Sequence, residues 1–142
     1  MNGDLAHRCA AVMWKDDAAS QGLGMAIGQV AAGTASLTMA VRADMLNGLG
    51  VCHGGFIFSL ADSAMAFAAN AHGAHAVAQH ASIAFIRPGR EGETLTATVE
   101  ERSRAARSGL YDVRVTGSSD GTVVAEFRGH TRLTGGRFFT EP

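Results

Sequence analysis

Cysteine is scarce in this 142-residue sequence, and there is little proline or net charge. The two cysteines, Cys9 and Cys52, lie far apart and match no metal-ligand spacing, so we expect neither a disulfide framework nor a metal site. A formal net charge of −1 gives no reason to expect nucleic acid or an anionic membrane as a partner. Any phosphate-bearing ligand must therefore meet local clusters of arginine.

Long apolar runs are also lacking. The best candidate for a membrane segment, residues 56–69, is too short to cross a bilayer and contains Asp62. No basic residues lead into an apolar run at the N-terminus, so no signal peptide is predicted and we expect a cytoplasmic protein. The length predicts one domain over residues 1–142.

Hydrophobic periodicity predicts the order of the elements. Helical spacing indicates a short N-terminal helix at about 4–15, and residues 56–71 are apolar in nearly every direction, as in a buried helix. Alternating patterns predict strands at 25–31, 36–42, 77–86, 94–100, 110–116 and 123–133, before a loose tail at about 135–142. We therefore expect an α+β domain whose antiparallel sheet curves around one long central helix.

Asp62 is the only ionisable residue between Gly54 and Ala71. An ionised carboxylate on an apolar helix is costly unless it is paired or hydrated. One interpretation is structural, with Asp62 satisfied by a backbone donor or a distant arginine. The other is catalytic, with the carboxylate orienting or deprotonating water, or attacking directly.

The central helix opens with two glycines, Gly54 and Gly55. Unpaired N–H groups and the helix dipole at such an end favour a developing negative charge, as in an oxyanion hole. A simple tight turn is the alternative. His53 fixes the loop or touches the ligand, and Asn47 is a turn residue or an amide donor near the reacting carbonyl.

Helix geometry limits how these residues can cooperate. Eight residues separate Gly54 from Asp62, which places them about 12 Å apart along the helix axis. They cannot act on one carbonyl within the same copy. If they form a site, Asp62 must meet Gly54 of a second copy across a two-fold axis, so a homodimer is predicted.

These residues resemble a known family. Asn47, the run His53-Gly54-Gly55 and the following Asp62 are similar to the hotdog-fold acyl-CoA thioesterases, most of all to the phenylacetate-degradation (PaaI-type) branch. The similarity extends from about residue 23 to 135. It includes Phe85-Ile-Arg-Pro-Gly and Phe127-Arg128-Gly129.

The resemblance implies a hotdog fold, dimers that pair into tetramers, and active sites at the dimer interface. It implies that the Gly54 amide binds the oxyanion, that Asp62 of the partner subunit is the base or nucleophile, and that Asn47, His53 and Gly55 support them. Some relatives carry a water-positioning serine where this chain has Ala78, so Ser63 is a candidate replacement.

For the substrate, the resemblance implies aryl-acetyl-CoA thioesters, hydroxylated ones included, with medium-chain acyl groups as the next choice. Coenzyme A belongs to the substrate, so no separate cofactor is expected. Arginine suits its phosphates. The residues expected to contact coenzyme A are Arg87, Pro88, Gly89, Arg90, Ser103, Arg104, Arg107 and Ser108.

Two other functions are compatible with the pattern. A hotdog dehydratase acting on acyl-CoA or acyl-carrier protein needs a histidine paired with an acid, and His80 is the only histidine on a predicted strand near the site. A non-catalytic acyl-CoA-binding module would keep the arginines and tolerate loss of Asp62.

Overall fold

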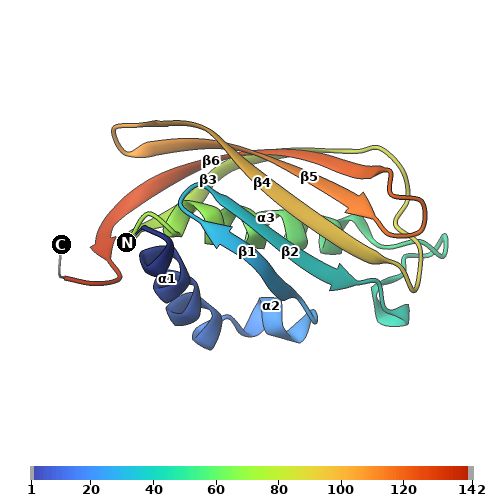
Figure 1. Ribbon diagram of the computed structural model, residues 1–142. Helices are drawn as coiled ribbons and strands as arrows, with labels where there is room; N and C mark the ends of the chain where they lie inside the picture. The colour runs from blue at the N-terminus through green and yellow to red at the C-terminus, as the bar shows by residue number, and fades with distance from the viewer. Residues whose placement is uncertain (1, 141–142) are drawn as a thin grey trace.

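The computed structural model describes residues 2–140. Its helical elements are α1 (Asn2–Asp16), α2 (Ala18–Gly22), the 3-10 turn η1 (Ala43–Met45) and α3 (Gly54–Asn70). Its strands are β1 (Ala26–Ala31), β2 (Thr34–Ala40), β3 (Ala74–Phe85), β4 (Thr94–Ala105), β5 (Ser108–Gly117) and β6 (Val123–Arg137). Figure 1 shows α3 lying along one face of the sheet, with α1 and α2 next to β1.

The central helix α3 forms because its sequence is apolar around most of its circumference and is capped at both ends. The imidazole of His53 accepts a hydrogen bond from the Gly55 N–H at 2.9 Å, which caps the N-terminus. At the other end, the Asn70 amide donates to the carbonyls of Ala66 and Ala76, and its oxygen accepts the Ala76 N–H. Asn70 therefore fixes the turn from α3 into β3.

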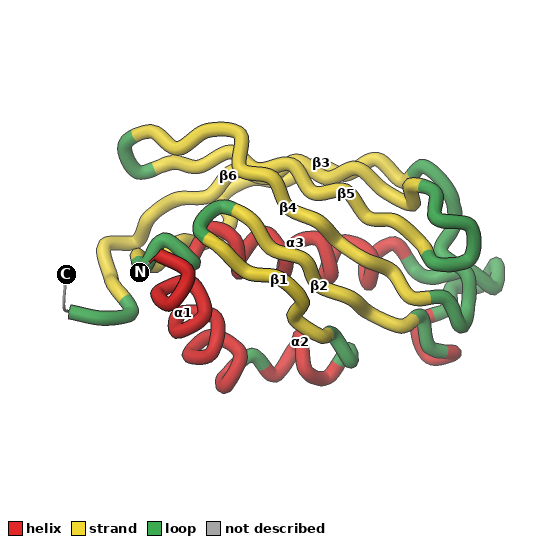
Figure 2. Tube along the Cα trace, in the orientation of Figure 1, coloured by secondary structure: helices red, strands yellow, loops and turns green. Residues whose placement is uncertain are grey.

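Residues 2–140 contain a six-stranded sheet in the order β1-β2-β4-β5-β6-β3, and every neighbouring pair is antiparallel. On β5, Tyr111, Val113 and Val115 are buried against α3, whereas Asp112 and Arg114 point to the opposite face, as the alternation predicted. The sheet wraps around α3 (Figure 2), so the predicted α+β arrangement is confirmed.

Strand β3 lies at one end of the sheet. It pairs with β6 on one side, and its other edge has no partner strand within residues 2–140. Apolar side chains remain exposed along it, including Val77 at 54% and Phe85 at 51% of their full area. Natural proteins seldom leave such an edge open, because its unpaired backbone groups readily pair with another strand.

The two ends of the chain differ from the expected boundaries. Helix α2 is an addition, too short to show periodicity, and Asp17 caps it by accepting the Ser20 N–H at 2.9 Å. The loose tail expected from residue 135 is corrected, because β6 continues to Arg137 and pairs with Ala74. The Phe138 N–H then donates to the Gly73 carbonyl at 3.1 Å, and residues 141–142 lie outside the described part.

Across residues 2–140, none of the helices has the length and apolar character needed to span a membrane.

Candidate active site

One face of α3 is left partly exposed. Gly55, Ser59, Asp62 and Ala66 follow one another at steps of four, three and four residues, so they form a single stripe along the helix. We call these four residues the open stripe. Most of the helix behind it is buried, including Leu60, Ala61, Ala64 and Met65. The open stripe therefore places the only charge of the helix on a partly exposed face.

Asp62 has no hydrogen-bond or ion-pair partner among the described residues. Burial raises the pKa of its carboxyl group above the usual value. The side chain is still partly exposed and reaches an open cleft of about 440 Å³ between α3 and the start of β3. We call this space the Asp62 cleft; it is lined by Met13, Asp62, Met65, Ala66, Asn70, His75, Ala76, Val77, Ala78, Thr131, Thr134 and Phe138.

The N-terminus of α3 offers one unused donor. The Gly55 N–H is taken by His53, whereas the Gly54 N–H has no acceptor within residues 2–140. The ring of Phe85 lies against Gly54 so closely that an added Cβ would come within 2.9 Å of it. The helix start therefore combines a free amide with the positive end of the dipole, beside an apolar ring, which suits a developing oxyanion.

The loop before α3 is held on both sides. Asn47 accepts the N–H groups of Leu49 and Val51 at 2.9 and 3.3 Å through its side-chain oxygen, so it is a turn residue. The His53 N–H donates to the Met45 carbonyl, and the Cys52 N–H donates to the Gly89 carbonyl. Of the two roles considered for His53, these hydrogen bonds support fixing the loop. The side-chain NH₂ of Asn47 has no acceptor among the described residues.

Gly54 and Asp62 lie on one uninterrupted helix. Their separation of eight residues corresponds to about 12 Å along the axis. As the sequence indicated, a single copy therefore keeps the Gly54 amide and the Asp62 carboxylate apart.

Arg87 has a different role from the one predicted. Its five N–H groups donate to Thr122, the Pro88 carbonyl, both oxygens of Glu93 and Asp120. The Arg87 side chain is only 13% exposed. With every donor used inside the chain, Arg87 fixes the loop between β3 and β4 and is not available to a phosphate.

Replacing Glu93 by glutamine should lower the free energy of unfolding by about 3 kcal/mol, because it removes one partner of a buried ion pair. Hydrogen bonds from Arg87 and from the Arg90 and Ser119 N–H groups hold the pKa of Glu93 at about 2. A lowered carboxyl pKa adds stability above the unfolded-state pKa and loses it as the pH falls towards 2. Urea unfolding at pH 7 and pH 3 should show the difference between wild type and Glu93→Gln shrinking at the lower pH. Equal losses at both pH values would contradict this role.

Of the other three predicted site residues in this loop, one is buried and two are exposed to solvent. Gly89 is buried, with the Cys52 side chain 3.1 Å from where its Cβ would be, whereas Pro88 is exposed. The Arg90 side chain donates one hydrogen bond to Ser119 and lies 3.8 Å from an oxygen of Asp120, but it stays 54% exposed. Arg90 is therefore the cation of this loop that remains accessible to a ligand.

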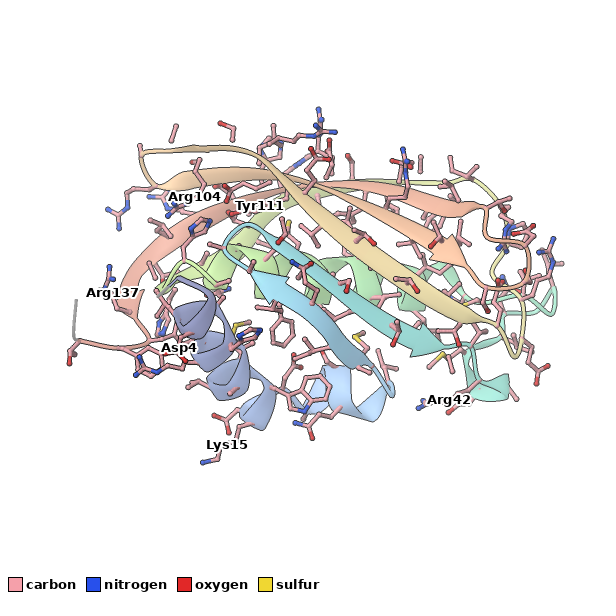
Figure 3. The ribbon with its side chains drawn as sticks, in the orientation of Figure 1. Asp4, Lys15, Arg42, Arg104, Tyr111 and Arg137 are labelled. Carbon is pink, nitrogen blue, oxygen red and sulfur yellow. The ribbon has the colours of Figure 1, made fainter. Side chains whose placement is uncertain are left out.

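The second predicted cluster lies at the β4–β5 hairpin. Arg104, Arg107 and Ser108 line a hollow of about 180 Å³ whose floor includes Tyr111 and Thr131, and Ser103 is exposed nearby. Figure 3 shows Arg104 and Tyr111 towards this end of the sheet. Strand β4 runs from the Arg90 loop to this hairpin, about 35 Å for its twelve residues. One copy therefore does not bring the two clusters together.

Two other expected residues lie away from the cleft. The Ser63 hydroxyl is 2.9 Å from that of Ser20 on α2, and Ser63 does not line the Asp62 cleft. The imidazole of His80 is exposed and packs edge-on against His130, outside the Asp62 cleft. Within one copy, His80 and Asp62 therefore do not form the acid–histidine pair that a dehydratase needs.

The family is decided by comparison with known proteins. A family model described as "Thioesterase superfamily" matches residues 49–124, which include the start of α3 and Asp62. Acyl-coenzyme A thioesterase PaaI of Escherichia coli K12 is 45% identical over 127 residues, covering 89% of this chain and 90% of that protein. The chain belongs to the thioesterase superfamily.

Solved structures agree with this membership. The thioesterase is similar to the E. coli PaaI protein from the phenylacetic acid degradation operon, with a TM-score of 0.94 and 42% identity over 96% of this chain and 99% of the other. A mutant of the phenylacetic acid degradation protein PaaI from Thermus thermophilus matches at TM-score 0.76 and 36% identity, covering 80% and 96%. A Streptococcus mutans protein bound to acetyl CoA matches at TM-score 0.76 and 27% identity, covering 80% and 90%. The predicted hotdog thioesterase fold is confirmed.

Proposed function

We propose that this acyl-CoA thioesterase hydrolyses aryl-acetyl-CoA, at sites that two copies of the chain build together. The observation that carries the proposal is the unpaired Asp62 carboxylate in an open cleft, on the same helix as an unused Gly54 amide. The similarity to PaaI proteins from phenylacetic acid degradation supports the aryl-acetyl group. A relative bound to acetyl CoA supports the coenzyme.

In the proposed reaction, the thioester oxygen accepts a hydrogen bond from the Gly54 N–H of one copy. Asp62 of the partner subunit takes a proton from water, and the water oxygen adds to the carbonyl carbon. The carbon–sulfur bond then breaks, and the proton held by Asp62 passes to the sulfur, so the coenzyme leaves as a thiol and the acyl group as the free acid. His53 and Gly55 keep the helix terminus in place, and the Asn47 side-chain NH₂ is a second donor near the carbonyl. Negative charge at the helix start is favoured by the dipole throughout.

The surface next to Asp62 is suited to a second copy. The open stripe is made of small residues on both sides of Asp62, so another α3 can approach closely in an antiparallel direction. With the two-fold axis near Phe58 and Ser59, midway along this segment, Asp62 of each copy faces the Gly54 end of the other. The neighbouring open edge of β3 allows the two sheets to pair. Two such dimers would form the expected tetramer.

Coenzyme A phosphates would meet the accessible cations. Arg90 at one end of the sheet and Arg104 and Arg107 at the other are all exposed, and Ser103 and Ser108 add hydroxyl groups beside the hairpin. Because these clusters are far apart within one copy, a single coenzyme reaches both only if they come from different subunits. Pro88 and Gly89 shape the loop that presents Arg90.

The test is a thiol-release screen with phenylacetyl-CoA, hydroxyphenylacetyl-CoA, octanoyl-CoA and acetyl-CoA. The highest kcat/KM is expected with the aryl-acetyl esters. Saturated substrates also separate the alternatives, since a dehydratase leaves the thioester intact and a binding module retains it without turnover. Absence of thiol release from all four esters would sink the proposal.

The pH profile should report Asp62. Only the ionised carboxylate can take a proton from water, and burial raises its pKa above the ordinary value for aspartate. The value of kcat/KM should therefore fall as the pH is lowered, and the pH at which half of it is lost should lie above the ordinary pKa of aspartate. Initial rates from pH 4 to 9 measure this midpoint. A flat profile over that range would show that no carboxylate of this kind is needed.

A further inference from the structure

The Asp62 cleft continues away from the carboxylate along α3. Its floor runs from Asp62 past Ala66 to Asn70, and Val77 and Ala78 of β3 form the facing side. Eight residues of helix correspond to about 12 Å. When a thioester carbonyl is held beside Asp62, this length leaves room for an acyl group much larger than acetyl.

The walls of the cleft are apolar and come from both ends of the chain. Met13 of α1 and Phe138 after β6 line it together with Met65 of α3. The small side chains of Ala66 and Ala78 leave the space between these walls open. An aromatic acyl group packs well between these walls. The ring of Phe138 and the thioethers of Met13 and Met65 both make favourable contacts with the face or edge of an aromatic ring.

Beyond Asp62, the polar side chains that line the cleft are those of Asn70, His75, Thr131 and Thr134. The amide of Asn70 is engaged by Ala66 and Ala76, and the Thr134 hydroxyl is 3.4 Å from the His75 carbonyl. The imidazole nitrogens of His75 have no hydrogen-bond partner among the described residues. The ring packs edge-on against Phe138, with a centroid distance of 4.3 Å. It also lies over Gly136, where a Cβ would come within 2.6 Å of it.

These walls are held by contacts outside the cleft. Helix α1 buries Ala6 and Cys9 completely, and its Trp14 packs against Phe67 of α3 with ring centroids 6.3 Å apart. The Phe138 N–H donates to the Gly73 carbonyl, and the guanidinium of Arg8 on α1 lies 4.1 Å from the ring centre of Phe139. The positions of Met13 and Phe138 are thus set by the fold before any ligand arrives.

We infer that the Asp62 cleft is the acyl pocket, in which Met13 and Phe138 hold an aromatic ring and His75 hydrogen-bonds a hydroxyl group on that ring. The inference rests on the proposed function, because it places the thioester at Asp62. It adds the residues that select the acyl group, two of which belong to α1 and to the segment after β6. A neutral imidazole both donates and accepts, so it suits a phenolic hydroxyl in either direction.

The experiment compares ratios of kcat/KM in the full-length protein. Met13→Ala and Phe138→Ala should each lower the phenylacetyl-CoA to acetyl-CoA ratio about tenfold, because each removes apolar contact that only the larger acyl group makes. His75→Phe keeps a ring against Gly136 and Phe138 but cannot hydrogen-bond. It should lower the hydroxyphenylacetyl-CoA to phenylacetyl-CoA ratio about tenfold.

Val12→Ala is the matched control, since it shortens the apolar side chain next to Met13 on α1, which is 44% exposed and does not line the cleft. It should leave both ratios at the wild-type values. Unchanged ratios in Met13→Ala, Phe138→Ala and His75→Phe, with Asp62-dependent turnover intact, would overturn the pocket and leave the proposed function standing. A wild-type protein without any thiol release would overturn both.

Discussion

Asp62→Asn should lower kcat for aryl-acetyl-CoA by about three orders of magnitude, the range typical of losing a general base. The substitution keeps the size of the side chain but removes its ability to accept a proton at neutral pH. Because the coenzyme is bound elsewhere, KM should change much less than kcat. Thiol release under saturating substrate measures the first quantity, and its dependence on substrate concentration measures the second.

The same variant separates catalysis from structure. Burial raises the pKa of Asp62 in the folded state, so this group favours the fold below its unfolded-state pKa and loses that contribution as the pH rises through the folded-state value. At pH 7 the ionised carboxylate therefore weakens the fold, and Asp62→Asn should be at least as stable as wild type. A structural carboxylate would show the opposite, a clear loss in the free energy of unfolding.

Asp44→Asn is the control for Asp62→Asn. Asp44 makes an exposed pair with Arg42 and has a side chain that is 69% exposed, so the same chemical change there should leave turnover unchanged. Equal activity of the Asp62 and Asp44 variants would rule out a catalytic role for Asp62.

Gly54→Pro should lower kcat/KM by about 10² to 10³-fold, which is typical for the loss of one oxyanion donor. Proline removes the N–H and nothing else that the helix needs, because it is well tolerated at the first helical position. His53 before it already has φ −59° and ψ 133°, a conformation that a following proline favours. Initial rates at low substrate concentration give the value directly.

Gly54→Ala is the matched variant, since it adds a Cβ against Phe85 but keeps the amide. The Cβ that displaces the Phe85 ring is common to both variants, so the difference between them reports the lost N–H together with the two remaining ring carbons of proline. Gly54→Ala should therefore retain most of the activity that Gly54→Pro loses. Similar losses in both would mean that crowding at Phe85, and not the amide, is responsible.

The two inactive variants together test the composite site. A mixed dimer of Asp62→Asn and Gly54→Pro contains one site with both native groups and one site with neither. Unfolding and refolding an equal mixture should therefore restore about a quarter of the wild-type activity, because about half of the dimers are mixed and each has one good site. If mixed dimers form but activity does not recover, the composite site is wrong. Either Asp62 and Gly54 then act within one copy, or one of them does not belong to the site.

The sequence predicted best the features that depend on residues close together in the chain. The buried helix with one carboxylate, the two glycines at its start and the alternating strands were all predicted, since each pattern records which side of its own element is buried. It was less successful with Arg87 and Arg90, which look equivalent in sequence. The N–H groups of Arg87 donate to Glu93, Asp120 and Thr122, and these partners come close to Arg87 only in the folded protein.

The amino-acid pattern alone placed one ionisable group on an apolar helix, two turns from a glycine-rich start, so Asp62 and Gly54 of a single copy could not act on one carbonyl. The surroundings of that group became visible only in the folded protein. Met13, His75 and Phe138 line the Asp62 cleft together although they are far apart in the chain. Ser63 instead contacts the hydroxyl of Ser20. Local patterns reflect the period of a helix or strand, whereas contacts between distant segments depend on how the sheet closes around α3.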